Sequence, residues 1–427
     1  MTTTRPQRGQ RANQPAPPSA EPDAARRRGG ATARVVVQRV FGAETGNFFL
    51  LLGTTLFLLA FGLVMVLSSS SVEDGASAGH DFFSSFARQG LYALVGVPLL
   101  LIASRMPIGF WKKWAWPAVV GTSVLQLLVF APGLSYAFQG NQNWIRIGSF
   151  TAQPSELVKL ALILWVSWIL ARKRSLLDDW KHVFLPIAPV AGVAIGLVLL
   201  GHDLGTAIIM GMIVLGCLFY AGVRLRIVGV AIVVAGGIAL LFTQVGSSRT
   251  GRISAWMEGC TAKSDFQGDC WQTIHAWWGI ASGGIFGSGL GESKVKWSWL
   301  PEADNDFIFA IIGDELGLIG AALVLVLFVV LAIAFIRIIR SSTDPFARIV
   351  TGGVMIWLVG EAFVNIAVVL GFLPVLGVPL PLISAGGSSL IASLVAIGVV
   401  LSFARHQPVR EPLREPLREP PREPARE

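Results

Sequence analysis

The chain has 427 residues, of which only 14% are charged and 53% are hydrophobic. Soluble domains carry about 25% charged residues, so this composition excludes a soluble globular protein and indicates an all-α polytopic membrane protein. The net charge of +8 does not predict nucleic-acid binding. The basic residues lie mainly in the tails and short loops, as membrane topology requires.

The first and last segments differ in composition from the rest. Residues 1–46 are polar, rich in Pro, Ala and Arg, and lack the apolar stretch of a signal peptide, so we expect a disordered tail. Residues 406–427 repeat Arg-Glu-Pro units, and their frequent prolines forbid a regular helix. We expect a second disordered tail there and a membrane domain over residues 47–405.

Ten apolar stretches divide the membrane domain, and each is near the ~20 residues that cross a bilayer. The predicted spans are 48–68, 87–104, 114–131, 154–171, 183–200, 204–222, 227–245, 307–336, 348–371 and 385–404.

The short loops predict the orientation. Basic residues concentrate in alternate loops, within 105–113, 172–181, 224–226 and 337–348. By the positive-inside rule these loops are cytoplasmic, which places both termini inside. Residues 246–305 then form a large extracytoplasmic loop between the seventh and eighth spans.

The segment "WLPEADNDFIFAIIGDELG" (299–317) leads into the eighth span with Glu302, Asp304, Asp306, Asp314 and Glu315. A helix cap explains one of these acids but not five. Several carboxylates around a polar cavity suit proton abstraction from a hydroxyl, cation coordination or a proton path. All three interpretations stay open, and they share an outward-facing acidic site.

Polar residues also occur near the ends of other spans. Glu156 and Lys159, three residues apart in "PSELVK", share one helix face and either cap the helix or line a wet cavity. Asp203 in "GHDLGT" is either part of a tight turn or a site residue. Glu361 and Asn365 share one face of the ninth span, where they join two helices or face a cavity.

The long outer loop contains six tryptophans, which favour the headgroup layer and predict a lid on the membrane surface. Its glycine-rich part ends with Lys294 and Lys296, and backbone amides there could hold phosphate. Cys260 and Cys270 lie in this loop, and an oxidising compartment would permit a disulfide between them. The Cys and His spacing fits no metal motif.

Four motifs occur in order: "WIRIGSFTAQPSELVKL", "HDLGTA", "GSGLGESKVKWSWLPEADNDFIFAIIGDELG" and "NIAVVLGFLPVLGVPLPLISAGGSS". Together they resemble the SEDS family (shape, elongation, division and sporulation) over residues 45–405. The pre-acid loop is more similar to the division members, FtsW, than to the elongation members, RodA. The long tails are similar to those of actinobacterial FtsW proteins.

The resemblance implies the SEDS fold and a peptidoglycan glycosyltransferase. Such an enzyme polymerises lipid II into β-1,4 glycan strands outside the cytoplasmic membrane, at the division septum. The family's catalytic Asp matches Asp306. Two positions depart from the family pattern, because Asp304-Asn305 replaces His-Thr and Asn143 replaces an Arg whose anion contact Arg146 would take over.

The resemblance also implies further site residues and partners. The candidate substrate-binding residues are Glu156, Lys159, Arg146, Asp203, Glu302, Lys294, Lys296, Glu361, Asn365 and Ser388. The metal ligands are unknown, although Mg²⁺ or Mn²⁺ would help to balance the lipid diphosphate. The implied partners are a class B penicillin-binding protein transpeptidase and other divisome proteins. A lipid II flippase, a scaffold for that transpeptidase and a RodA-like polymerase remain alternatives.

Overall fold

The computed structural model describes residues 45–76, 84–138, 141–148, 150–243, 247–260, 268, 270–296 and 300–405. The two expected tails lie outside these residues, except that helix α2 already begins at Gly46. The helices are α2 (Gly46–Ala76), α3 (Ser84–Ala103), α4 (Ile108–Leu127), α5 (Pro154–Arg172), α6 (Trp180–Leu200), α7 (Leu204–Ala221), α8 (Leu225–Thr243), α9 (Ser247–Glu258), α10 (Trp271–Gly283), α11 (Ile308–Glu315), α12 (Gly317–Ser341), α13 (Pro345–Met355), α14 (Glu361–Val369) and α15 (Gly387–Arg405).

Ten helical segments in the described part of the chain are long and apolar enough to cross a membrane, which confirms the predicted number. One of them, 345–369, runs from α13 to α14 through a π-helical turn at Ile356–Gly360. The span of α5 is 78% buried, whereas that of α8 is 11% buried. Helix α5 is therefore central, and α8 presents most of its apolar surface to lipid.

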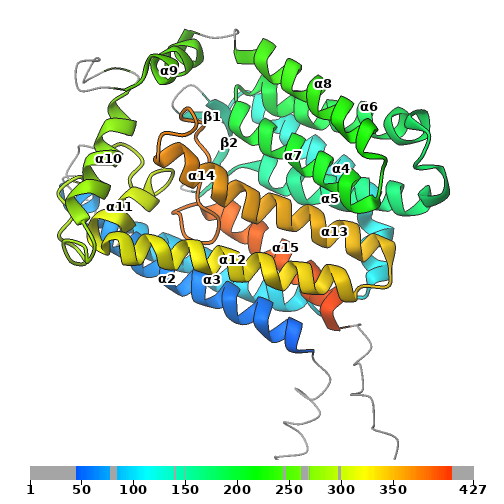
Figure 1. Ribbon diagram of the computed structural model, residues 1–427, viewed down its shortest axis with the longest axis horizontal. Helices are drawn as coiled ribbons and strands as arrows, with labels where there is room; N and C mark the ends of the chain where they lie inside the picture. The colour runs from blue at the N-terminus through cyan, green and yellow to red at the C-terminus, as the bar shows by residue number, and fades with distance from the viewer. Residues whose placement is uncertain are drawn as a thin grey trace, which may run out of the picture. The chain divides into compact units, whose positions relative to one another are not determined.

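The expectation of a single eighth span over 307–336 is wrong. The chain forms the short helix α11, breaks, and resumes as α12 (Figure 1). Gly317 lies at the break with a φ of 66°, and a Cβ atom there would come within 2.5 Å of the Ile285 carbonyl oxygen. Only glycine fits this turn and this close approach.

A small sheet also departs from the all-α expectation. Strands β1 (Ser135–Phe138), β2 (Asn141–Ile147) and β3 (Phe150–Ala152) pair antiparallel in that order, between α4 and α5. Aromatic and β-branched residues such as Trp144 and Ile145 favour strands. The amide of Gln142 donates to the Gly201 carbonyl at 2.8 Å, which fastens β2 to the turn between α6 and α7.

The two ends of the bundle differ in character. At one end, Lys112 pairs with Asp344 at 2.6 Å and Arg224 pairs with Asp178 at 2.7 Å. The first ion pair joins the basic loop at 105–113 to that at 337–348, and the second joins the loop at 172–181 to that at 224–226. At the other end lie α9, α10 and α11 (Figure 1). The predicted outer loop 246–305 thus contains two helices, and the acidic segment is on their side of the bundle.

Candidate active site

Asp306 lies two residues before α11, and its backbone is fixed by a side chain of α14. The Asn365 side-chain amide donates to the carbonyl oxygens of Asp306 and Val378, each at 2.7 Å. Gly377 lies against the carboxyl group, because a Cβ atom there would be 3.5 Å from Asp306 Oδ2. Asn365 therefore joins the acidic segment to the irregular segment that follows α14.

The residues just before Asp306 are bound to the same irregular segment. The Ser384 hydroxyl donates to the Asn305 carbonyl at 2.6 Å, and the Ala385 amide donates to the Asp304 carbonyl at 2.9 Å. The Gln89 side chain donates to the Ser384 carbonyl at 2.9 Å, which adds α3 to this arrangement. The spans of α14 and α3 and the irregular segment between α14 and α15 thus hold the Asp306 backbone in place.

Asp203 approaches from the start of α7. Its Oδ1 accepts from the Thr206 amide at 2.9 Å and caps the helix, while its Oδ2 accepts from the Gln153 side chain at 3.0 Å. Gly205 packs on the Leu376 carbonyl, where a Cβ atom would come within 2.3 Å. Asp203 thus caps α7 at the turn between α6 and α7, and the helix start also contacts the segment that borders Asp306. The role of Asp203 as a site residue stays a prediction.

Backbone strain marks the same region. The non-glycine residues with positive φ in the described ranges are His202, Glu302 and Leu382, at 66°, 58° and 68°. Each lies in one of the three segments that meet at Asp306. Strained backbone of this kind gathers at functional sites when the surrounding structure enforces it.

Asp306 is half-buried. Burial, together with the negative charges of Glu302, Asp203 and Asp304, raises the pKa of its carboxyl to about 7, and the positive charge of Arg252 opposes that rise. Burial also raises the pKa values of Glu302 and Asp203 above their ordinary range. A carboxyl with a pKa near neutrality is suited to accept a proton at the pH of the cell.

Lys159 lies deeper in the bundle with two carboxylates. Its Nζ is 3.0 Å from Glu156 Oε1 and 3.2 Å from Glu361 Oε1, and all three side chains are at most 5% exposed. The Trp357 ring lies 4.9 Å from the same nitrogen. These groups bind one another and join α5 to the α13–α14 span, so a direct role in substrate binding stays a prediction.

Asp314 and Glu315 form a separate cluster away from Asp306. Ser282 and Ser293 donate to Asp314, the latter at 2.6 Å. Lys296 pairs with Glu315 at 3.1 Å, and both side chains are fully buried. The five acids of the sequence motif therefore divide into an open group around Asp306 and a closed group that fastens the glycine-rich loop.

The remaining predicted residues are dispersed. The Arg146 guanidinium stacks on Tyr136 at 3.6 Å within the small sheet, and Lys294 is exposed. Ser388 accepts from the Gln153 amide at 3.0 Å, which ties the start of α15 to that of α5. Their roles in substrate binding stay predictions.

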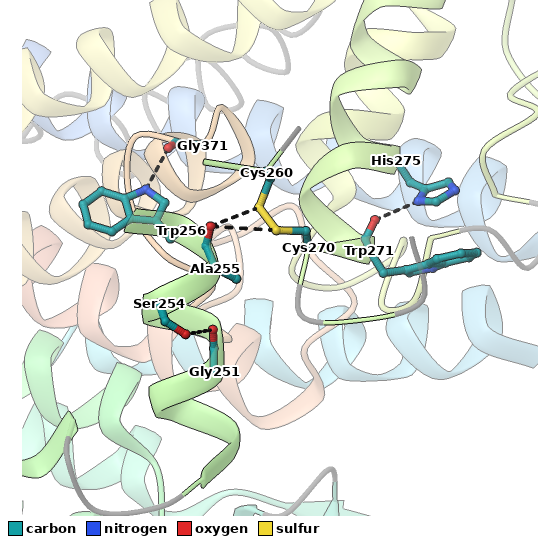
Figure 2. Close-up of a disulfide and its surroundings, with 9 residues drawn as sticks. All are labelled: Gly251, Ser254, Ala255, Trp256, Cys260, Cys270, Trp271, His275 and Gly371. Carbon is teal, nitrogen blue, oxygen red and sulfur yellow. Dashed lines mark hydrogen bonds between the residues drawn. A yellow bond between two sulfur atoms is a disulfide. The ribbon is translucent and has the colours of Figure 1, made fainter. Parts of the chain in front are cut away.

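Sequence reasoning missed Arg252, the cation on α9 that acts on Asp306. No local pattern in the sequence relates Arg252 to Asp306, which lies 54 residues later. Figure 2 shows how this helix is held. Trp256 donates to the Gly371 carbonyl at 2.9 Å, and a disulfide joins Cys260 to Cys270 with their Cα atoms 5.5 Å apart.

Comparisons with known proteins place this geometry in context. A family model described as "Cell cycle protein" and covering FtsW, RodA and SpoVE matches residues 49–408. The probable peptidoglycan glycosyltransferase FtsW of Mycobacterium tuberculosis is 38% identical over 392 residues, which are 91% of this chain and 73% of that protein. The corresponding Geobacter sp. protein is 40% identical over 359 residues, which are 84% of this chain and 96% of that protein.

Solved structures agree on the fold. A chain from a peptidoglycan synthase complex aligns with a TM-score of 0.67 and 23% identity, over 84% of this chain and 98% of that one. The rod shape determining protein RodA of Thermus thermophilus aligns with a TM-score of 0.62 and 24% identity, over 84% of this chain and 97% of that one. At these identities the likeness establishes the fold alone.

Proposed function

The chain belongs to the FtsW/RodA/SpoVE family of cell cycle proteins, and from this premise we propose that it is a septal peptidoglycan glycosyltransferase. Its substrate is lipid II, which it polymerises into β-1,4 glycan strands. One observation carries the proposal: Asp306 is half-buried on a backbone that Asn365 and Ser384 fix in place, and burial with neighbouring carboxylates raises its pKa to about 7. This is the group that a sugar hydroxyl needs as a base.

The proposed reaction is a direct displacement. The 4-hydroxyl of one sugar gives its proton to Asp306 and attacks the anomeric carbon of another. The bond from that carbon to the polyprenyl diphosphate breaks, and the diphosphate leaves with the electron pair. An α-linked donor and a β-linked product require inversion, which suits one carboxylate base without a covalent intermediate. The positive charge of Arg252 acts on Asp306, and in this proposal it stabilises the leaving diphosphate.

Purified protein with lipid II and the partner transpeptidase tests the proposal. We expect long glycan strands on a denaturing gel, and they should persist when the transpeptidase is inhibited. Movement of lipid II across vesicle membranes without polymer would instead support a flippase. Strands formed equally well when this protein is left out would support a scaffold.

We propose that the Asp306 end faces outward and that the cell holds the protein in its cytoplasmic membrane with both termini inside. The ion pairs Lys112–Asp344 and Arg224–Asp178 bring the basic loops together at the end opposite to α9, α10 and α11. Positive loops remain in the cytoplasm. Exported lipid II then meets the acidic site on the outer side.

Reporter fusions test the orientation. Fusions after Lys181, Arg226 and Arg405 should report a cytoplasmic location, because each position lies in or after a basic loop. A fusion after Glu258 in α9 should report the opposite side. A cytoplasmic signal from the Glu258 fusion would separate Asp306 from exported substrate and contradict the proposed function.

A divalent cation and a partner enzyme complete the proposal. No three His, Cys, Asp or Glu side chains within the described ranges are grouped to hold a metal ion. Magnesium is nevertheless often bound through one or two carboxylates and substrate phosphates, and Asp203 lies near enough to influence Asp306. We therefore propose that Mg²⁺ or Mn²⁺ arrives with the diphosphate. Unchanged polymer formation in excess chelator would contradict a role for the cation. Full activity without the transpeptidase would show that the enzyme does not require this partner.

A further inference from the structure

Helix α9 carries Arg252, and described contacts join it to the rest of the protein at its C-terminal end. Trp256, one turn after Arg252, donates to the Gly371 carbonyl where the α14 span ends. Cys260 follows α9 directly and forms the disulfide with Cys270 (Figure 2). Both sulfur atoms lie 3.9 Å from the Ala255 carbonyl oxygen, so the disulfide packs against the last turns of the helix.

The other half of the disulfide belongs to a firmly packed element. Cys270 is 3% exposed and directly precedes α10. Gly283 at the end of α10 touches α11, because a Cβ atom there would come within 2.0 Å of the Gly313 carbonyl oxygen. Gly371 in turn contacts Trp277 of α10, where a Cβ atom would come within 2.3 Å of the ring. Helix α10 is thus packed against the helix that follows Asp306.

These contacts form a continuous path between the cation and the base. Arg252 is linked through the disulfide to α10, then through close packing to α11, whose start follows Asp306. The hydrogen bond from Trp256 to Gly371 also connects α9 to the surroundings of Asp306. Gly371 begins the segment after α14, and Gly377 of that segment lies beside the Asp306 carboxyl. A cation near the leaving diphosphate would stabilise the charge that develops there.

We propose that the Cys260–Cys270 disulfide is a positioning element that holds α9 against α10 and so keeps Arg252 at the Asp306 end of the protein, where it binds the departing diphosphate. The inference rests on the proposed glycosyltransferase function. Reduction to two thiols would leave the Trp256–Gly371 hydrogen bond at this end of α9 but remove the covalent link, so that Arg252 would be at the site only part of the time. Turnover would fall although Asp306 and its supporting residues are unchanged.

The test compares four forms of the full-length protein in the lipid II assay: wild type, Cys260→Ser/Cys270→Ser, Arg252→Gln, and all three changes together. Removing one positioned stabiliser of developing charge costs roughly a hundredfold in turnover, and we expect that loss for Arg252→Gln. The double serine variant should lose about tenfold, since Arg252 still visits the site part of the time. Residues that act as one unit are not additive, so the combined variant should match Arg252→Gln.

A pH profile separates this role from general destabilisation. The charge of Arg252 lowers the pKa of Asp306, against burial and the carboxylates of Glu302, Asp203 and Asp304. Loss of that charge should raise the pKa, so the pH at which activity rises should move upward in both Arg252→Gln and the double serine variant. Arg252→Lys should restore part of the wild-type profile.

Matched controls use other positions in the chain. Ser254→Ala alters α9 at an exposed residue whose hydroxyl donates to the Gly251 carbonyl of the same helix, and it should keep the wild-type rate and profile. Wild type treated with a phosphine reductant tests the folded protein if the serine variant does not fold. Cys217→Ala should respond to the reductant in the same way, because Cys217 is a buried free thiol of α7.

Full activity and an unchanged profile after reduction would overturn the proposal. The proposal would also be overturned if the combined variant lost a further tenfold in rate relative to Arg252→Gln alone. The disulfide would then act independently of Arg252. Failure of the glycosyltransferase function itself is distinct, since oxidised wild type would then form no polymer at all.

Discussion

Asp306→Asn is expected to lower glycan polymerisation at least about a hundredfold, because general-base catalysis contributes about 10²–10⁴-fold. The amide keeps the shape of the side chain but cannot accept a proton at neutral pH. The backbone bonds from Asn365 to Asp306, and from Ser384 and Ala385 to its neighbours, do not involve the carboxyl. The variant should therefore fold, insert and bind its partner as wild type does.

Two neighbouring variants are the matched controls for this result. Asp304→Asn and Glu302→Gln change the charge beside Asp306 but leave its carboxyl intact, so each should reduce the rate less than Asp306→Asn. The comparison uses equal amounts of membrane-extracted protein with lipid II and the partner transpeptidase. Near-wild-type polymer from Asp306→Asn would reject Asp306 as the base and direct attention to Asp304 or Glu302.

Lys159→Met is expected to reduce stability by about 3–5 kcal/mol, the usual cost of removing one partner from a buried ion pair. Lys159 is 1% exposed and lies between Glu156 and Glu361, at 3.0 and 3.2 Å. Without the ammonium, two carboxylates would share a site away from water. The measurement is chemical unfolding of the purified protein in detergent.

Removal of all three charges gives the control for the Lys159 prediction. Lys159→Met combined with Glu156→Gln and Glu361→Gln leaves no uncompensated charge, so it should recover part of the lost stability. Recovery of stability without recovery of polymer would assign the triad a second role near the substrate. Wild-type stability of Lys159→Met alone would contradict the structural role described above.

The ten spans were predictable because the length of each apolar stretch can be counted in the sequence. The break at Gly317 was not, because hydropathy does not report a positive φ or the carbonyl of Ile285 that lies against the glycine. The small sheet at 135–152 was missed for a related reason. Composition averaged over a membrane protein hides a short segment between two spans that has its own strand pattern.

Local spacing predicted part of the site. Glu156 and Lys159 do share a helix face and pair at 3.0 Å, as their separation of three residues indicates. The partner Glu361 is 202 residues from Lys159, and no local pattern reveals such a contact. Lys296 was a candidate ligand of the diphosphate because its partner could not be seen in the sequence either. In the structure its ammonium group pairs with Glu315, and both side chains are fully buried.

The acidic motif shows the same limit. Its five carboxylates were expected to lie around one polar cavity. Instead, α11 brings Asp314 and Glu315 into contact with Ser293 and Lys296. The number of residues between two positions on a helix gives their distance along the helix axis. The contacts of each side chain depend on which other elements pack around that helix. Arg252 escaped notice because its relation to Asp306 exists only after α9 and the segment after α14 come together.

The most direct measurement for Asp306 as the base is the initial rate of lipid II polymerisation as a function of pH, for wild type and Asp304→Asn. The carboxyl must be ionised to accept a proton, so the wild-type rate should be low in acid and rise through a pH of about 7. Asp304→Asn removes a negative neighbour that raises this pKa, so its rise should occur at lower pH. A wild-type rate that stays constant well into acid, or an identical rise in both proteins, would contradict a base at Asp306.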